Sequence, residues 1–346
     1  MSSVSVVIPC YNYGHFLHDA VRSVLDDQPG VDVRVLVIDD ASSDDSVEVA
    51  RAIAAHDERV VVSEHAANRG HIVTYNEGLL DWADGDYTVL LSADDQLTPG
   101  ALHRAVDLLD VNPSVGFVYG HPLHFQHGTP LPRARTTVRG WSVWDGHWWL
   151  ERNFRSAHSY ITSPEVVVRT SLQKSVGGYD QQLPHTGDME MWLRLATYAN
   201  VGYIQGVDQA FYRVHGKNMQ KSWTQLVDLR QRRMAYETLL ERCADSLPQA
   251  GRLSDTVHRK LARQALWCAA RAYDRGRTEQ TPVDDLIAFA VDCWPDVNRS
   301  QAYRGLWLRQ RIGARTMPFL QPFVVSAVTH KAQYWWWRRS WALRGL

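Results

Sequence analysis

The sequence predicts an α/β protein with a Rossmann-like, mostly parallel central sheet covered by helices, followed by a helical C-terminal appendage. Three observations predict this fold class. Strand and helix patterns alternate from the N-terminus, the strands are short continuous apolar runs, and polar residues follow the strands directly. From Trp223 onward, apolar residues recur only at helical spacing. We therefore predict an α/β domain over residues 1–222 and a helical region over residues 223–346.

The individual elements follow from their apolar patterns and from the polar residues that bound them. Helix starts are predicted at capping residues such as Ser42 and Ser43, and at Thr281-Pro282 in the C-terminal region. The predicted strands are residues 4–8, 33–38, 60–62 and 87–91, and the predicted helices are residues 15–27, a segment after Asp44, and a segment that carries Tyr75, Leu79 and Leu80.

Polar side chains come just after these strands. They are Tyr11 and Asn12, Asp39 and Asp40, Asn68, and the pair Asp94 and Asp95. Because the carboxyl ends of parallel strands lie along one edge of a sheet, these residues should converge there. That is the layout of a nucleotide site.

The adjacent carboxylates of Asp94 and Asp95 repel each other, so they need a cation or hydrogen-bond donors. A divalent metal that carries a substrate's phosphates suits hard oxygen ligands. The alternative is a turn that caps the next helix, with Pro99 in its first turn. The sequence has neither GxGxxG after the first strand nor GxxxxGK[ST], which excludes a dinucleotide fingerprint and a P-loop. Phosphate binding would then depend on a metal held by Asp95.

The charge distribution is uneven although the net charge is −1. After Asp296 there is no acidic residue but there are nine Lys or Arg, which suggests an anionic partner such as lipid or nucleic acid. None of the four cysteines forms a CxxC pair, so we expect no structural zinc site. We also expect the protein to lie in a reducing cytoplasm. We also expect no signal peptide, and no apolar run approaches the roughly 20 residues that span a bilayer.

Seven segments, in order, resemble the signature segments of family 2 glycosyltransferases. They cover roughly residues 3–222 and read VSVVIPCYN, VLVIDDASSDDS, NRGHIVTYNEGL, GDYTVLLSADDQLTPGAL, SPEVVVRTSLQKSVGGYD, TGDMEMWLRLA and FYRVHGKNMQKS. The resemblance implies the GT-A fold and an inverting, nucleotide-sugar-dependent enzyme that uses Mg²⁺ or Mn²⁺.

The resemblance also implies roles for residues that bind the donor. Pro9, Tyr11 and Asn12 would hold the nucleoside, and Asn68 lies among the same converging residues. Asp39 would accept a hydrogen bond from the imide N–H of uracil or thymine, since a charged acceptor makes the stronger bond.

At the diphosphate end, Asp94 would lie near the ribose and Asp95 would ligate the metal. Many family members read Asp-Ala-Asp-Asp where this chain has Ser92-Ala93-Asp94-Asp95, so one acidic position is missing. That leaves open how tightly the metal is held without the sugar nucleotide.

Downstream, Asp188 aligns with the aspartate of the family's Glu-Asp motif, although Gly187 replaces the glutamate. Its implied role is the general base that takes the proton of the acceptor hydroxyl, and the alternative is a helix N-cap. Arg213 and His215 match the closing motif, where Arg213 would contact the donor and His215 would reach the metal or the diphosphate. Either role would stabilise negative charge on the departing nucleoside diphosphate.

Two tryptophan-rich segments have no assigned role. Residues 141–149 could stack on an acceptor or form the core of an inserted helix. Residues 331–346, with the aromatic cluster at 334–341, could contact an anionic membrane or pack on the protein itself. The expected location is the cytoplasm, with peripheral association at the inner face of the membrane.

The sequence therefore predicts an inverting glycosyltransferase that moves a sugar from a UDP- or dTDP-sugar to an acceptor hydroxyl by metal-assisted single displacement. Its partners would be the nucleotide sugar and a glycan, lipid-linked or small-molecule acceptor, with no nucleic acid, and its role would be in surface glycan or glycoconjugate biosynthesis. Two alternatives remain, namely a non-catalytic nucleotide-sugar-binding protein and a sugar nucleotidyltransferase. The latter usually needs a glycine- and lysine-rich loop after the first strand, which residues 11–17 do not supply.

Overall fold

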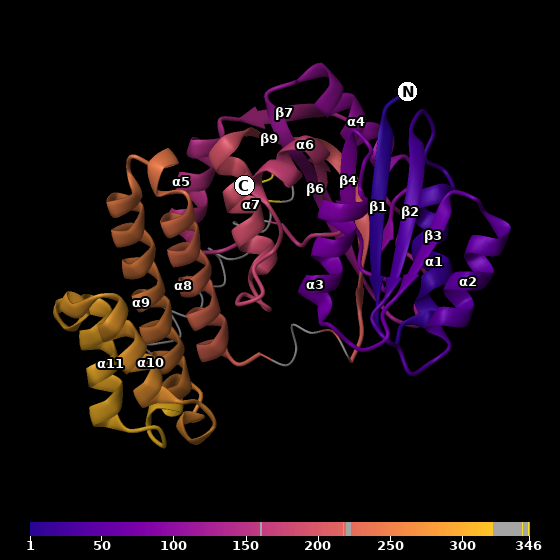
Figure 1. Ribbon diagram of the computed structural model, residues 1–346. Helices are drawn as coiled ribbons and strands as arrows, with labels where there is room; N and C mark the ends of the chain where they lie inside the picture. Colours follow the sequence, from indigo (N-terminus) through magenta and orange to yellow (C-terminus); the bar gives the residue numbers. More distant parts are fainter. Residues whose placement is uncertain (160, 217, 219–222, 321–340, 342–344, 346) are drawn as a thin grey trace. The chain divides into compact units, whose positions relative to one another are not determined.

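The computed structural model describes the chain except for residues 160, 217, 219–222, 321–340, 342–344 and 346 (Figure 1). The chain forms two compact units. The first comprises Met1–Leu150, Ser159–Asn218 and Ala342–Leu346, and the second comprises Glu151–His158 and Met219–Trp341. Most of the predicted membrane-contacting tail, residues 331–346, lies outside the described residues.

A mixed nine-stranded sheet forms the centre of the first unit. Its strand order is β3-β2-β1-β4-β8-β6-β9-β5, and β7 pairs with β9. Strands β3, β2, β1 and β4 are mutually parallel, whereas β8 runs antiparallel to both β4 and β6. The strands are β1 Ser3–Cys10, β2 Asp32–Asp39, β3 Val60–Glu64, β4 Tyr87–Leu90, β5 Gln96–Leu97, β6 Val115–Gln126, β7 Gly140–Trp144, β8 Val167–Arg169 and β9 Asn200–Val214.

Helices cover both faces of this sheet (Figure 1). The apolar sides of α1, α2 and α4 join alternate residues of β1 and β2, such as Val6 and Val35, in one continuous buried core. Burial of these aliphatic side chains is the main stabilising contribution of the unit. The helices are α1 Gly14–Leu25, α2 Ser46–His56, α3 His71–Asn76, a π-helical segment η1 Glu77–Trp82, α4 Ala101–Val111, α5 Gly146–Ser156, α6 Thr170–Val176 and α7 Gly187–Tyr198.

On the other face, η1 approaches β1 and β2 closely at Gly78. A Cβ atom at this position would lie 2.3 Å from Cγ1 of Val7 and 3.2 Å from Cδ1 of Ile38. Only glycine permits this approach, which helps to seat α3 and η1 on the sheet. The chain then reaches β4, whose end carries the second acidic pair.

The predicted α/β fold class is confirmed, and the element boundaries differ by small amounts. The helix predicted after Ser42 and Ser43 begins only at Ser46. Asp44 instead accepts hydrogen bonds from the backbone amides of Ser46, at 3.1 Å, and Gly14, at 3.3 Å, so it joins the starts of α2 and α1.

The second unit is helical. α9 packs against α8, α10 and α11 (Figure 1). The buried face of α9 presents residues at helical spacing, including Val257, Leu261 and Ala265. None of the helices in the described part of the chain is long and apolar enough to cross a membrane. The elements are α8 Gln225–Arg242, η3 Ala244–Ser246, α9 Ala250–Asp274, η4 Thr278–Gln280, α10 Val283–Cys293, η5 Pro295–Arg299, α11 Gln301–Ile312 and η6 Met317–Phe319.

Candidate functional site

The first acidic pair ends β2, and its second member is fully engaged with the protein. Asp40 accepts hydrogen bonds from the backbone amides of Arg69, at 2.7 Å, and Gly70, at 2.9 Å, and contacts the His65 ring at 2.7 Å. Burial alone would raise the pKa of Asp40, but these three donors outweigh it and hold the pKa below its ordinary value. Asp40 therefore anchors the loop that carries Asn68, whose side-chain amide donates to the Asp40 carbonyl at 3.2 Å.

The first member, Asp39, keeps one oxygen available. Its Oδ2 accepts the Ser42 amide at 2.9 Å, whereas its Oδ1 is buried and has no hydrogen-bond partner among the described residues. Buried carboxylate oxygens without a donor are rare in folded proteins and mark a place where an outside group can bind. An N–H donor of a ligand would satisfy this atom.

The turn after β1 lies beside Asp39, because Cys10 pairs with Asp39 in the sheet. Asn12 has a left-handed backbone with φ of 58°, and its Oδ1 accepts the Ser43 amide at 2.8 Å. Tyr11, the residue before it, is 50% exposed. The three predicted nucleoside residues, Pro9, Tyr11 and Asn12, therefore lie at the same sheet edge as the free oxygen of Asp39.

The second acidic pair follows β4 and is less well compensated. Asp94 and Asp95 are both buried, and Oδ1 of Asp95 accepts the backbone amide of Arg213 at 2.9 Å. Burial, and then the negative charge of Asp94, raise the pKa of Asp95 well above its ordinary value. Two adjacent carboxylates that are both buried need hydrogen-bond donors or a cation to offset their repulsion.

The closing strand β9 brings Arg213 and His215 to this pair. His215 contacts Asp94 Oδ2 through Nε2 at 2.8 Å. The Arg213 guanidinium donates to the Asp94 carbonyl at 2.8 Å and to Asp19 at 3.1 Å, and lies between the rings of Phe16 and Phe125. Arg213 thus supports the backbone of the acidic pair, and its predicted contact with the donor stays a prediction.

Asp188 lies in the first turn of α7 and is half-buried, although it does not cap that helix. The N-cap position belongs to Thr186, and the Asp188 carboxylate accepts a hydrogen bond from the Ser163 hydroxyl at 2.5 Å. Burial raises the pKa of Asp188, which Ser163 and the nearby rings of His71 and His185 partly oppose. A raised pKa makes a carboxylate a stronger base than an ordinary aspartate.

Three phenol side chains respond to the charges of the acidic residues. The pKa of Tyr75 and that of Tyr212 are raised, first by burial and then by the charges of Asp94, Asp95 and Asp188. The pKa of Tyr13 is raised to about 12, by burial and by Asp94 and Asp95. Because the interaction between charges weakens with distance, Asp94, Asp95 and Asp188 are expected to lie near the same phenols.

Glu165 is a further buried acid, and it was not among the predicted site residues. Its side chain is 2% exposed, Oε1 accepts the Thr162 amide at 2.7 Å, and Oε2 has no partner among the described residues. Burial raises the pKa of Glu165 to about 8, and the charge of Asp188 adds to this. It also contributes to the raised pKa of Asp95. Only its motif context, directly after Ser163-Pro164, could have drawn attention to it.

The acidic pair fits a divalent metal to which the protein supplies only a few of the coordinating atoms. Asp95 and the neighbouring His215 are oxygen and nitrogen donors of the right kind, and burial followed by the charge of Asp94 raises the pKa of Asp95. Within the residues that the structure describes, no three His, Cys, Asp or Glu side chains group as metal ligands. Oxygens of a bound diphosphate would therefore have to complete the coordination sphere.

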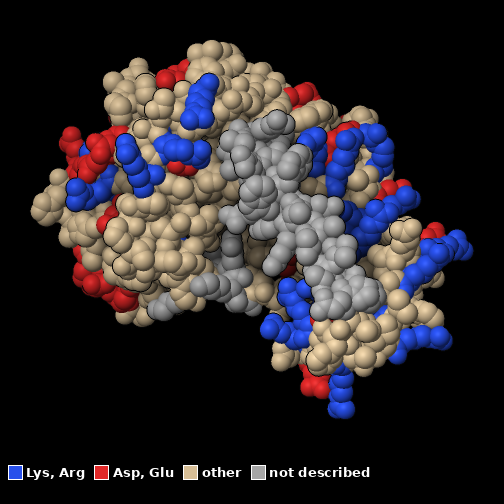
Figure 2. Space-filling view, turned by 180° about the vertical axis from the view of Figure 1, so that it is seen from behind, with Lys and Arg blue, Asp and Glu red and all other residues tan. Residues whose placement is uncertain are grey.

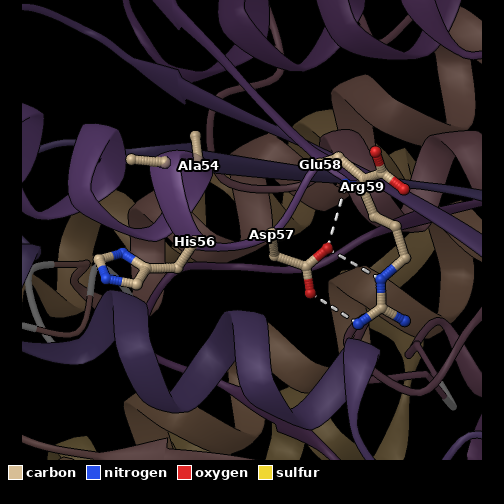
Figure 3. A pocket seen from close by; sticks show the side chains of 6 residues that line it. Ala54, His56, Asp57, Glu58 and Arg59 are labelled. Atoms are coloured by element: carbon tan, nitrogen blue, oxygen red, sulfur yellow. Dashed lines mark hydrogen bonds and ion pairs between the residues drawn. The ribbon is translucent and has the colours of Figure 1, made fainter.

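A separate surface concavity lies at the turn between α2 and β3 (Figure 3). Its charged side chains are already engaged, since Arg59 pairs with Asp57 at 2.6 Å and the His56 ring contacts the Ala52 carbonyl at 2.7 Å. All of its lining comes from one six-residue segment. The polar residues of the sheet edge, and not this concavity, form the candidate site.

The tryptophan-rich segment divides between core and surface. Trp149 is buried and donates to the Tyr119 hydroxyl at 3.2 Å, whereas Trp141 and Trp148 are 39% and 45% exposed. Trp144 stacks on Trp148 with ring centroids 6.4 Å apart. Residues 141–149 can therefore either stack on an acceptor or form the core of an inserted helix, and both interpretations stay open.

The chain is similar to known glycosyltransferases in sequence and in fold. Residues 5–170 match the family model described as Glycosyl transferase family 2. The chain is 32% identical over 131 residues, which are 38% of its length, to the glycosyltransferase TuaG of Bacillus subtilis (strain 168), whose name gives a provisional role in teichuronic acid biosynthesis. The chain spans about half of the length of TuaG, 51%.

Two solved structures share the fold at low sequence identity. S. aureus TarS 1-349, in complex with UDP-GlcNAc, has a TM-score of 0.62 at 15% identity and covers 94% of this chain and 92% of its own. The mannosyltransferase PcManGT from Pyrobaculum calidifontis, in complex with GDP-Man and Mn2+, has a TM-score of 0.55 at 16% identity, with coverage of 94% and 86%. The sheet and its helices are thus the GT-A fold of glycosyltransferases.

Proposed function

We propose that this chain, whose residues 5–170 belong to glycosyltransferase family 2, is an inverting enzyme that transfers a sugar from a UDP- or dTDP-sugar to an acceptor hydroxyl. The observation that carries the proposal is the common space faced by Asp94, Asp95 and Asp188, whose charges act on the same two phenols. A sugar diphosphate and an acceptor hydroxyl must meet in such a space for a single displacement.

The donor's nucleoside binds along the first acidic pair. The free Oδ1 of Asp39 accepts the imide N–H of uracil or thymine, which supplies the missing partner of that buried oxygen. Pro9, Tyr11 and Asn12 line the adjacent turn, and Asn68 lies on the loop that Asp40 anchors. Asp94 and its partner His215 then lie toward the ribose and the diphosphate.

The chemical step is an in-line exchange at C1 of the sugar. Asp188 accepts the proton of the acceptor hydroxyl while that oxygen forms its bond to C1. The bond from C1 to the diphosphate oxygen breaks on the opposite face, and the nucleoside diphosphate leaves with the electron pair. An α-linked donor gives a β-linked product. Because burial raises the pKa of Asp188, activity falls toward acid with a midpoint above the ordinary carboxyl value.

A divalent metal belongs to this proposal as a cofactor. Asp95 and His215 would hold Mg²⁺ or Mn²⁺, which when bound neutralises the charge of the leaving diphosphate. PcManGT was solved with Mn2+. On the protein side, Arg213 keeps Asp95 in place by donating its amide to Oδ1.

The acceptor is proposed to be a surface glycan or a lipid-linked precursor, at the inner face of the membrane. Figure 2 shows Lys and Arg side chains, interspersed with Asp and Glu, on the surface of the molecule. Residues 297–320 carry five arginines and no acidic residue. Positive charge of this kind favours anionic headgroups or a polyanionic acceptor.

Asp188→Asn separates the enzyme from its alternatives. We expect release of UDP from UDP-GlcNAc with Mn²⁺, or transfer to acceptor, to fall by at least ~100-fold, while the donor still raises the melting temperature. The matched control is Asp107→Asn, an exposed aspartate on α4. Equal activity of wild type and Asp188→Asn would remove Asp188 from the mechanism.

The same assay distinguishes the two other functions. Stabilisation by UDP- and dTDP-sugars without any turnover would indicate a binding protein, and pyrophosphate release from a nucleoside triphosphate and a sugar phosphate would indicate a nucleotidyltransferase.

A further inference from the structure

Ser163 has a backbone conformation that is unusual for its residue type. Its φ is +106°, in the region that favours glycine. It lies in the segment between α5 and β8, and its hydroxyl donates to Oδ2 of Asp188 on α7. Strained residues persist where the surrounding structure determines them, and they cluster at functional sites. The segment that holds Ser163 therefore needs a physical explanation.

The turn at residues 162–165 is fixed from within. The Val166 amide donates to the Ser163 carbonyl at 3.2 Å, which closes the turn. The Glu165 carboxyl accepts the Thr162 amide at 2.7 Å, and its second oxygen is buried without a partner in the described structure. A buried acid that interacts with backbone amides of its own turn and keeps one oxygen without a partner is costly.

We propose that the turn at residues 162–165 is a positioning device for the base, in which the Ser163 hydroxyl orients the Asp188 carboxylate and Glu165 holds Ser163 in its strained conformation. The inference rests on the proposed function, because it assigns a task to Asp188. Ser163 is a positioning residue, since it acts through Asp188.

The geometry divides the two oxygens of Asp188. Oδ2 accepts the Ser163 hydroxyl, and the hydrogen bonds of the described residues leave Oδ1 without a protein donor. An acceptor hydroxyl can then bind to Oδ1 while the carboxylate plane is fixed by Ser163. Fixing a reacting group in this way preserves the geometry that proton transfer needs.

The hydroxyl of Ser163 also favours the charged state of Asp188. The other titratable groups that act on Asp188, or that its charge acts on, are His71 and His185, Glu165, and the phenols Tyr75, Tyr179 and Tyr212. The two imidazoles lower the pKa of Asp188 together with Ser163, against burial. Loss of the Ser163 donor should therefore shift the acid limb of activity to higher pH.

Ser163→Ala and Ser163→Gly test the device as a pair. Alanine removes the hydroxyl and retains the strain, whereas glycine removes the hydroxyl and relieves the strain. If orientation by the hydroxyl matters, kcat for UDP release from UDP-GlcNAc with Mn²⁺ falls about tenfold or more in both variants, with KM for UDP-GlcNAc little changed. The midpoint of the acid limb should rise by on the order of one pH unit in both.

Ser175→Ala is the matched control, because the Ser175 hydroxyl donates only to the Leu172 carbonyl, at 2.8 Å, on the exposed side of α6. A kcat and a pH profile that match wild type in both Ser163 variants would overturn the inference. A loss confined to Ser163→Ala, with Ser163→Gly like wild type, would also overturn it, since the hydroxyl would then be dispensable.

Asp188→Asn keeps this inference distinct from the proposed function. If Asp188→Asn loses activity and the Ser163 variants do not, only the positioning role fails. If no UDP release is seen for any variant, a double-mutant cycle of Ser163→Ala and Asp188→Ala on thermal stability decides. Additive losses would overturn the contact between the two side chains, and coupled losses would support it.

Discussion

The two acidic pairs of the first unit are alike in sequence and differ in their surroundings. Asp39-Asp40 ends β2 and Asp94-Asp95 follows β4, at the same edge of the sheet. Around the first pair, backbone amides and an imidazole hold the pKa of Asp40 below its ordinary value. Around the second pair, burial and mutual repulsion raise the pKa of Asp95 well above it. In the first pair, Asp40 is satisfied by the fold and Asp39 keeps one oxygen without a partner, whereas in the second pair burial and the charge of Asp94 both disfavour the charged form of Asp95.

This difference shows that a repeated dipeptide can have two kinds of role. The donors to Asp40 come from Arg69 and Gly70, on the loop that follows β3, so Asp40 fixes the conformation of that loop. In the second pair, Asp95 receives one backbone amide, from Arg213, and Asp94 contacts the His215 ring. In the proposed function, the first pair serves the nucleoside and the second serves the cation. Loss of the charge of Asp40 should therefore lower the stability of the protein. Loss of the charge of Asp95 should raise its stability and lower its activity.

The largest effect is expected from Asp95→Asn. UDP release from UDP-GlcNAc with Mn²⁺ should fall at least ~100-fold, because the substitution removes the ligand charge that holds the cation. The unliganded protein should nevertheless become more stable. A carboxyl whose folded pKa is raised contributes stability below its unfolded pKa and loses it as pH rises through the folded pKa. The gain should therefore be present at pH 8 and absent near pH 4.

Melting temperatures at the two pH values, with and without Mn²⁺, measure this effect, and Asp107→Asn provides the exposed control. A lower melting temperature of Asp95→Asn at pH 8 would contradict the uncompensated charge. Unchanged activity would place the metal elsewhere.

The next effect concerns the free oxygen of the first pair. Asp39→Asn should weaken binding of UDP by about tenfold or more, because the charged acceptor of the imide N–H is lost. Binding of CDP should change much less, since cytosine has no N–H at that ring position. Calorimetric titration of both nucleotides measures the change, and an equal loss for UDP and CDP would show that Asp39 acts on the fold and not on the base.

Much of this comparison could be predicted from sequence, because it depends on local patterns. Apolar runs fixed the strands β1 to β4 to within two residues, and the topology of parallel strands then brought Asp39 and Asp95 to one edge. The distinction between Asp39 and Asp40 was not visible, since it depends on amides about thirty positions downstream. Long-range donors are set by loop conformation, which composition does not reveal.

The base environment shows the same limit. Asp188 was identified from its motif, and its predicted role as the base stays a prediction. Glu165 gave no signal, because a buried acid and a surface acid look alike in one sequence. The strain at Ser163 depends on a φ angle that serine rarely adopts, so no propensity argument would have found it.

The smallest effect is expected from Asp40→Asn, and it concerns stability. The carboxylate accepts two backbone amides and an imidazole contact, and its loss should destabilise the protein by about 1–2 kcal/mol. A carboxyl whose folded pKa is lowered contributes stability above its unfolded pKa and loses it as pH falls through the folded pKa. The difference from wild type should therefore be full at pH 7 and shrink toward pH 3.5.

Thermal or urea unfolding at the two pH values measures this loss, which corresponds to about 2–4 °C per kcal/mol in a domain of 150–250 residues. The sign is opposite to that expected for Asp95→Asn, so the two variants examined side by side test the comparison itself. If both substitutions stabilised the protein at neutral pH, or both destabilised it, the two pairs would not differ in the way that their hydrogen bonds indicate. Opposite signs with retained UDP binding in Asp40→Asn would assign Asp40 to the fold and would support the uncompensated charge of Asp95.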